Sequence, residues 1–181
     1  SRAHEHGLDA GDAHVWLDPN NAIAIVTLVL QALLEQDPSS APVYRRNAQQ
    51  IIERIRATDR QIIQLLADVR DVPYVVFHDA FTGFEQHYGL NRVAAIAGAS
   101  ARMPGTRRVQ AIRRVLEKAE VRCVFSEPQQ QPRLLDALID GLAIRRGVLD
   151  PLGGETAPGV NGWLHLMLRL AADLHACLAV R

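Results

Sequence analysis

Residues 74–84 read YVVFHDAFTGF, and this stretch decides the fold class. The run PYVVFH at residues 73–78 is apolar, aromatic and rich in β-formers, which predicts a buried strand that ends on a histidine. The following AFTGFEQHYG places three aromatic residues on one helical face and ends at Gly89, which predicts a short helix. A buried strand that passes directly into a helix is the repeating unit of a parallel α/β sheet.

The same alternation continues to the end of the chain. Apolar runs in NRVAAIAG, VRCVFS and RRGVLD predict three more strands, and the segments between them predict helices. A last helix carries one apolar stripe, made of Val160, Trp163, Met167, Leu170, Leu174 and Leu178. Strands separated by helices imply right-handed crossovers, so residues 72–181 are expected to form an α/β lobe with a parallel four-stranded sheet flanked by helices.

Two helices precede this lobe. Asp18 suits an N-cap and Pro19 the first helical position, and the NNAIAIVTLVLQALLEQ that follows is apolar around most of its girth, which predicts a well-buried helix. After Pro38, a heptad-like stripe runs from Tyr44 to Val69 without Gly or Pro. It predicts a helix of about 30 residues, about 45 Å long. The stripe alone is also compatible with a coiled-coil dimer.

Composition excludes several classes of protein. The chain has 20 Lys and Arg and 20 Asp and Glu, so its charge gives no reason to expect a nucleic-acid partner. The pairs Arg107-Arg108, Arg113-Arg114 and Arg145-Arg146 are interpreted as solvated faces. No apolar run approaches the ~18 to 20 residues that cross a bilayer, so no membrane span is expected.

The two cysteines, Cys123 and Cys177, are equally compatible with buried thiols and with a disulfide.

Polar residues follow three of the predicted strands. His78-Asp79, Ser126-Glu127 and Asp150 would all lie at the carboxyl edge of the sheet, where α/β proteins gather their binding residues. Each has a structural alternative: His78 as a hydrogen-bonded imidazole, Asp150 as a turn residue, and Asp79 as a helix N-cap, which is the interpretation favoured for it. His14, in DAHVWLDP, allows the same two interpretations as His78, with Trp16 beside it as a packing residue.

Together these residues suggest a metal site. Nitrogen and carboxylate donors held on separate rigid elements are what a tetrahedral Zn²⁺ site needs. His4, Glu5 and His6 belong to a Gly-, Asp- and His-containing stretch that is better suited to loose metal capture than to a fixed site.

Four blocks carry a family resemblance. DAHVWLDPNNA, VVFHDAFTGFEQHYGL, CVFSEPQ and GVLDPLG resemble, in order, the periplasmic high-affinity zinc-binding proteins of bacterial ABC importers, in the metal-binding cluster of solute-binding proteins. The resemblance implies two α/β lobes joined by one long rigid helix, with the metal between them. Residues 1–37 would then be the end of a His-containing loop and the last part of the N-terminal lobe, 38–71 the connecting helix, and 72–181 the C-terminal lobe.

The resemblance also implies roles for particular residues. His14 and His78 would be zinc ligands from the two lobes, and Asp150 a weaker or alternative ligand. An imidazole at position 78 favours zinc over manganese or iron. Cys123 and Cys177 occupy the positions of a disulfide that zinc members commonly carry in the periplasm. His4 and His6 resemble the end of the His-rich loop of those members.

The chain also departs from the family pattern. An early histidine of the N-terminal lobe has no counterpart, because most of that lobe is missing from the sequence, and Phe81 stands where tyrosine is usual. A site that lacks one imidazole is expected to hold zinc loosely.

The predicted function is capture of Zn²⁺ in the periplasm and its delivery to an inner-membrane ABC permease, without chemistry on a substrate. The affinity for zinc should fall as the pH is lowered, because only the neutral imidazole binds metal. Three alternatives are a manganese or iron importer component, a zinc hydrolase with Glu127 or Asp79 as general base, and an assembly domain without metal that uses its long helix.

Overall fold

The computed structural model describes residues 13–97, 105–129 and 132–179. Their helices and strands are, in chain order, η1 (Val15–Leu17), α1 (Pro19–Gln36), η2 (Pro38–Ser40), α2 (Ala41–Leu65), β1 (Tyr74–His78), α3 (Thr82–Tyr88), β2 (Arg92–Ala97), α4 (Thr106–Lys118), β3 (Cys123–Ser126), α5 (Pro132–Ile139), β4 (Arg145–Val148) and α6 (Gly162–Leu178). The candidate metal-capture residues His4, Glu5 and His6 lie outside the described residues.

The strands form one parallel sheet in the order β2-β1-β3-β4, as the sequence predicts. The register places Val76 beside Phe125 and Ser126 beside Val148, so β1, β3 and β4 end at the same edge. Gly147 leaves room there, because a side chain at that position would overlap the ring of Phe125. This arrangement brings the polar residues that follow three strands to one edge of the molecule.

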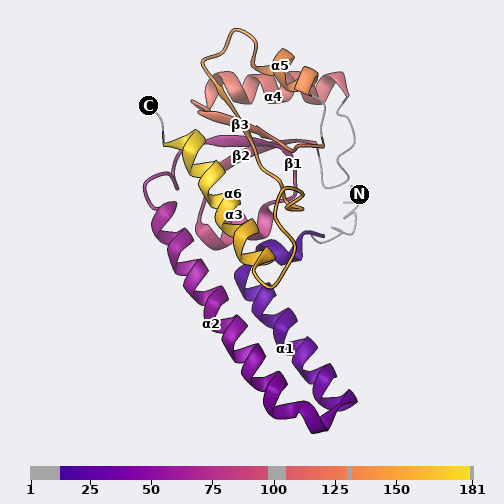
Figure 1. Cartoon of the computed structure of the whole chain (residues 1–181). Helices are drawn as coiled ribbons and strands as arrows, with labels where there is room; N and C mark the ends of the chain where they lie inside the picture. The colour runs from indigo at the N-terminus through magenta and orange to yellow at the C-terminus, as the bar shows by residue number, and fades with distance from the viewer. Residues whose placement is uncertain (1–12, 98–104, 130–131, 180–181) are drawn as a thin grey trace, which may run out of the picture.

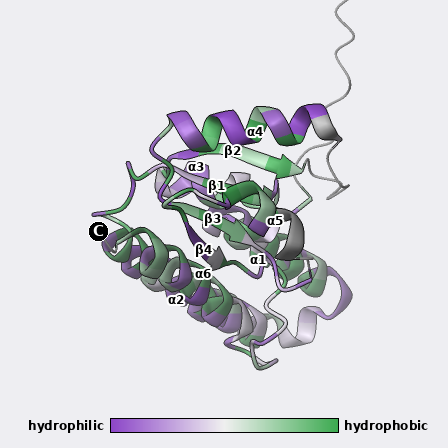
Figure 2. Cartoon of the chain, turned by 90° about the horizontal axis from the view of Figure 1, so that it is seen from above, coloured by the Kyte–Doolittle hydropathy of each residue, from purple (hydrophilic) through white to green (hydrophobic). Residues whose placement is uncertain are grey.

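Helices cover both faces of the sheet, and strand residues alternate between two cores. Tyr74, Val76, Cys123 and Phe125 face the core built with α2, α3 and α6. Val75, Phe77 and Val124 face the core built with α4 and α5. In Figure 2 the strands lie between α4 on one side and α2 and α6 on the other. The α/β class and the helices on both faces are therefore confirmed.

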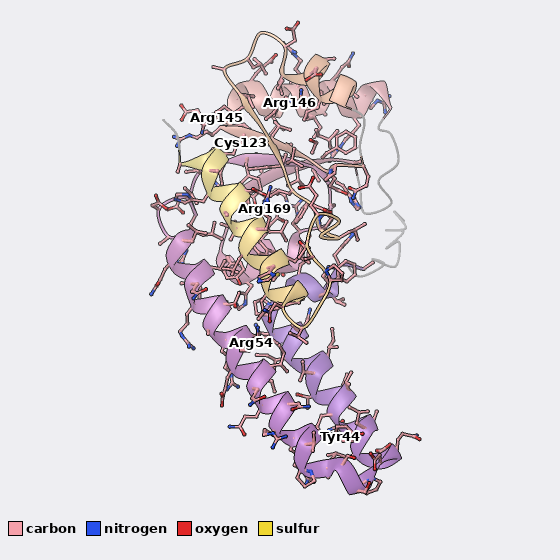
Figure 3. The ribbon with its side chains drawn as sticks, viewed as in Figure 1. Tyr44, Arg54, Cys123, Arg145, Arg146 and Arg169 are labelled. Atoms are coloured by element: carbon pink, nitrogen blue, oxygen red, sulfur yellow. A yellow bond between two sulfur atoms is a disulfide. The ribbon has the colours of Figure 1, made fainter. Side chains whose placement is uncertain are left out.

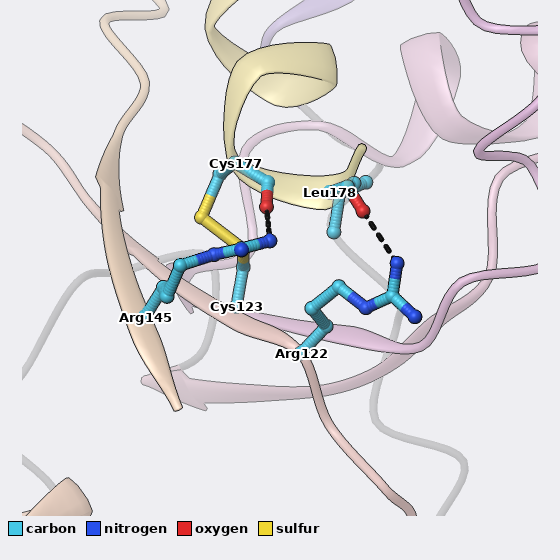
Figure 4. The surroundings of a disulfide bond; sticks show 5 residues. All are labelled: Arg122, Cys123, Arg145, Cys177 and Leu178. Atoms are coloured by element: carbon cyan, nitrogen blue, oxygen red, sulfur yellow. Dashed lines mark hydrogen bonds between the residues drawn. A yellow bond between two sulfur atoms is a disulfide. The ribbon is translucent and has the colours of Figure 1, made fainter. Parts of the chain in front are cut away.

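A disulfide joins Cys123 in β3 to Cys177 near the end of α6 (Figure 4). Two arginines flank it: Arg122 donates to the carbonyl of Leu178 at 2.8 Å, and Arg145 donates to the carbonyl of Cys177. Both carbonyls belong to the last turn of α6, which has no intrahelical donors for them and carries the negative end of the helix dipole. The covalent bond and the two cations thus fix the end of α6 against the sheet.

The arginine pairs are more than solvated faces, so that prediction is wrong for one member of each pair. Arg108 donates to the carbonyl of Ala95, Arg113 to the carbonyls of Leu138 and Asp140, and Arg145 to Cys177 as described above. The cause is topological, because each arginine lies beside the edge strand β2 or a helix end, where backbone carbonyls need donors.

The first two helices form a hairpin that extends away from the sheet (Figure 1). Asp18 caps α1 as predicted, its carboxylate accepting from the N–H of Asn20 at 2.7 Å. Tyr44 donates to Asp37 at the far end of the hairpin and closes the turn between the helices.

The predicted burial of α1 is wrong in this structure. Only Pro19 and Ala22 of the helix are buried, and four of its large apolar side chains are exposed: Ile25, Leu28, Val29 and Leu33. The physical reason is geometric. One face of α1 packs against α2, and beyond the sheet no other described element is placed to cover the opposite face.

The connecting helix is shorter than predicted. α2 spans 25 residues and ends at Leu65, although the apolar stripe continues to Val69. Beyond Leu65 the backbone hydrogen bonds change to a spacing of three residues, from Ala67 to Gln64 and from Val69 to Leu66. This tighter winding keeps Leu66 and Val69 buried while the chain turns toward β1.

Candidate metal centre

The structure brings His14 and His78 together. Their ring centroids are 5.2 Å apart, with the ring planes at 77°. His78 is the last residue of β1 and is 8 % exposed, and His14 immediately precedes η1, just before the helical hairpin. Two imidazoles that are distant in the chain therefore meet at the carboxyl edge of the sheet, as the family resemblance implies.

Glu127 holds the ring of His78. Its Oε1 lies 2.9 Å from Nδ1 of His78, and both side chains are mostly buried. Burial raises the pKa of Glu127 above its ordinary value, and the nearby His78 and His14 oppose that rise. When the carboxylate is ionised, Nδ1 donates to it, so the ring lone pair lies on Nε2.

This positioning role of Glu127 was missed by sequence reasoning. The sequence places Glu127 at the carboxyl edge but does not reveal that β3 is the neighbour of β1. The pairing of the two strands sets His78 and Glu127 side by side, and the signal that points to it is a carboxylate directly after a buried strand.

Asp150 lies in the same region, but its oxygens serve its own turn. Oδ1 accepts from the N–H of Leu152 at 3.1 Å and Oδ2 from the N–H of Gly154 at 2.6 Å. Its charge is close enough to help raise the pKa of Glu127. The alternative of Asp150 as a turn residue therefore describes its contacts here, and its role as a ligand stays a prediction.

Within residues 13–97, 105–129 and 132–179, no group of three or more His, Cys, Asp or Glu side chains is arranged to hold a metal ion. The arrangement around His78 is thus an imidazole pair with an orienting carboxylate. A full coordination shell needs either movement of Asp150 or ligands from outside the described residues.

Asp79 is not the N-cap of the next helix, which corrects the favoured interpretation. α3 begins at Thr82, with Phe81 in the capping position, because the N–H of Ala80 bonds the carbonyl of His78 and adds a turn before the helix. The Asp79 carboxylate instead accepts from the Thr82 hydroxyl at 3.0 Å and from Arg92 at 3.1 Å. It fixes the loop that follows His78.

Trp16 packs against the core as predicted, and it also forms a hydrogen bond. Its Nε1 donates to the carbonyl of Pro151 at 3.0 Å, and its ring centroid lies 5.3 Å from that of His14. The ring of Phe81 is buried in the same core.

A groove of about 590 Å³ runs between the edge strand β4 and α6. Its lining includes Asp150 and three arginines, Arg145, Arg146 and Arg169, which are labelled in Figure 3. Neither His14 nor His78 lines this groove. The imidazole pair is therefore separate from it.

Of the helices in the described part of the chain, none combines the length and the apolar character needed to cross a bilayer.

Comparison with known proteins gives the family. The family model described as "Zinc-uptake complex component A periplasmic" (ZnuA) matches residues 1–177. The "High-affinity zinc uptake system protein ZnuA" of Brucella suis is 38 % identical over 168 residues, which cover 93 % of this chain and 50 % of the relative. The protein of the same name from Paracoccus denitrificans is 35 % identical, covering 92 % of this chain and 52 % of the relative. The chain spans about half the length of these curated relatives.

Solved structures show the same fold. A crystal structure of ZnuA matches with a TM-score of 0.81 at 19 % identity, covering 97 % of this chain and 63 % of that one. A laminin-binding adhesin (Lmb) from Streptococcus agalactiae matches with a TM-score of 0.80 at 24 % identity, covering 92 % and 63 %. With the family model matched along almost the whole sequence, the chain belongs to the ZnuA family of periplasmic zinc-uptake components.

Proposed function

We propose that this chain is the metal-holding C-terminal portion of a periplasmic protein that captures Zn²⁺ and delivers it to an inner-membrane ABC permease. The observation that carries the proposal is the approach of His14 to His78 on a ZnuA-family fold. The curated relatives are named for high-affinity zinc uptake, which supports the same cargo.

The proposed ligands are His14 and His78, with Asp150 joining when it releases its own turn. Two imidazoles favour Zn²⁺ over Mn²⁺, because Mn²⁺ prefers sites dominated by oxygen donors. Glu127 supports this by keeping His78 in one tautomer. A manganese or iron importer component is the alternative, and competition between the metals separates the two.

The hydrolase alternative has less support. It needs Glu127 or Asp79 as a general base beside a metal-bound water. Glu127 is paired with His78, and Asp79 accepts from Thr82 and Arg92, so both carboxylates already have structural partners.

The proposed division of the chain into two lobes and a connecting helix is supported by the exposed face of α1. Residues 1–37 would end an N-terminal lobe, 38–71 would connect the lobes, and 72–181 would form the C-terminal lobe. The exposed apolar face of α1 supports this, because large apolar patches on a helix usually have a partner surface. In a chimera with the N-terminal half of the Brucella suis relative, amide exchange along α1 should slow; unchanged exchange would contradict the division.

Calorimetric titration of the purified chain with Zn²⁺ and Mn²⁺ tests the metal assignment. Zinc should bind and displace manganese, and its affinity should fall as the pH is lowered, because protons compete with the metal for imidazole nitrogen. Tighter binding of manganese, or zinc affinity that does not change between neutral and mildly acidic pH, would overturn the assignment to His14 and His78.

A further inference from the structure

Both tryptophans of the chain lie at one junction. Nε1 of Trp163, in the first turn of α6, donates to the backbone carbonyl of Trp16 at 2.7 Å. Nε1 of Trp16 donates in turn to the carbonyl of Pro151 at 3.0 Å. These two bonds, called here the indole clasp, join three segments: η1, the loop after β4, and the start of α6.

The clasp reaches both sides of the candidate metal centre. The ring of Trp16 contacts that of His14, whose ring in turn contacts His78. Pro151 directly follows Asp150. The segment that carries His14 and the turn that carries Asp150 are therefore joined by the hydrogen bond that the Trp16 side chain donates to the carbonyl of Pro151.

Apolar packing at the junction is incomplete, so these directional bonds matter. An open surface pocket of about 300 Å³ is lined there by the two indoles together with Leu152, Pro158 and Leu166. Side chains that face an open pocket have no protein atoms on that side, so packing alone fixes their positions less closely. The hydrogen bonds of the clasp have fixed donors and acceptors, so they define where η1 lies relative to the loop.

We infer that Trp16 and Trp163 are positioning residues for zinc binding: the indole clasp holds His14 and the Asp150 turn in one arrangement around His78 before metal arrives. The inference rests on the proposed function for its zinc readout. A site ordered in advance binds more tightly, because less ordering remains to be done on binding.

Substitution of each indole tests the clasp. Trp163→Phe keeps an aromatic ring but removes the N–H, so the carbonyl of Trp16 loses its donor. Zinc affinity should fall about tenfold, as for other partners that orient metal ligands, and mainly through faster dissociation. Trp16→Phe should act similarly, and the double variant should lose less than the two single losses combined, because both bonds serve one arrangement.

Leu116→Ala serves as the control for general destabilisation. Leu116 is buried on the opposite face of the sheet, in the core of α4 and α5. This variant should unfold more easily than the wild type but bind zinc with unchanged affinity. If Leu116→Ala weakened zinc binding as much as Trp163→Phe, the loss would reflect stability alone and the inference would be overturned.

A second readout does not need zinc. Nuclear Overhauser contacts between the rings of His14 and His78 should be present in the metal-free chain and weakened in Trp163→Phe. Unchanged ring contacts and unchanged zinc affinity in both Trp variants would overturn the inference. If the wild-type chain binds no zinc, the proposed function fails, and the ring contacts still decide whether the clasp positions His14.

Discussion

The Nδ1 atom of His78 and the Oε1 atom of Glu127 lie 2.9 Å apart, across the neighbouring strands β1 and β3. This contact fixes the plane of the His78 imidazole and the tautomer of its ring. Its importance can be measured by changing the carboxylate.

Glu127→Ala should lower zinc affinity between about 10- and 100-fold, because His78 loses its orienting partner. Glu127→Gln should lose less, since the amide oxygen can still accept from Nδ1. Calorimetric titration of both variants measures the difference. Glu117→Ala, at an exposed glutamate on α4 that pairs with Arg113, is the matched control and should bind zinc normally. Equal affinities for the wild type and Glu127→Ala would show that the contact is only structural.

His14→Ala and His78→Ala should each reduce zinc affinity more than about 100-fold, because loss of a ligand costs more than loss of its supporting partner. His87→Ala is the control: His87 is also partly buried, but its Nε2 bonds Asp59 on α2, away from the imidazole pair. Elemental analysis after dialysis against zinc provides the measurement. Normal zinc content in both ligand variants would refute the assignment of this site.

Removal of the Cys123–Cys177 disulfide should destabilise the chain by about 4 kcal/mol, since the bond closes a loop of 54 residues. Urea unfolding of the wild type and of Cys123→Ser/Cys177→Ser measures this loss. Alkylation without reductant should label no thiol in the oxidised protein. Two labelled thiols would show that the bond does not form.

Arg92→Gln should destabilise the chain by about 3 kcal/mol at neutral pH, because Arg92 balances the buried carboxylate of Glu85. Burial raises the pKa of Glu85, and Arg92 opposes the rise, so the variant raises it further. A carboxyl with a folded-state pKa above its unfolded value stabilises the fold when protonated and loses that contribution as pH rises. The deficit of the variant should therefore shrink from pH 7 toward about pH 5.

Urea unfolding at several pH values follows this deficit. Arg169→Gln is the control, because Arg169 forms an exposed ion pair with Asp173 on the same helix. Its effect should stay below about 1 kcal/mol at every pH. A constant deficit for Arg92→Gln across the pH range would contradict the proposed balance between Arg92 and Glu85.

Local sequence signals predicted local structure well. Asp18 and Pro19 started α1, Gly89 ended α3 in a left-handed conformation, and continuous apolar runs identified the buried strands β1 and β3. These signals failed where contacts between residues far apart in the chain determine the structure. Asp79 resembled an N-cap, yet Arg92 and Thr82 engage it, and the helix starts later.

The exposed face of α1 shows a second limit of prediction from local sequence patterns. Apolar residues around most of its circumference predicted that α1 would be buried. A pattern along one helix, however, indicates only that a partner surface is needed and does not identify the element that supplies it. Within the described residues this face of α1 stays exposed.

By itself the sequence determined the alternation of strands and helices, the parallel sheet and the edge to which His78, Glu127 and Asp150 belong. These follow from periodicity and chirality, which act over a few residues at a time. Only the tertiary structure decided that β3 lies beside β1, that His78 therefore meets Glu127, and that η1 returns to bring His14 to the same place. Strand order and loop docking depend on side-chain packing between segments far apart in the chain, which no local pattern encodes.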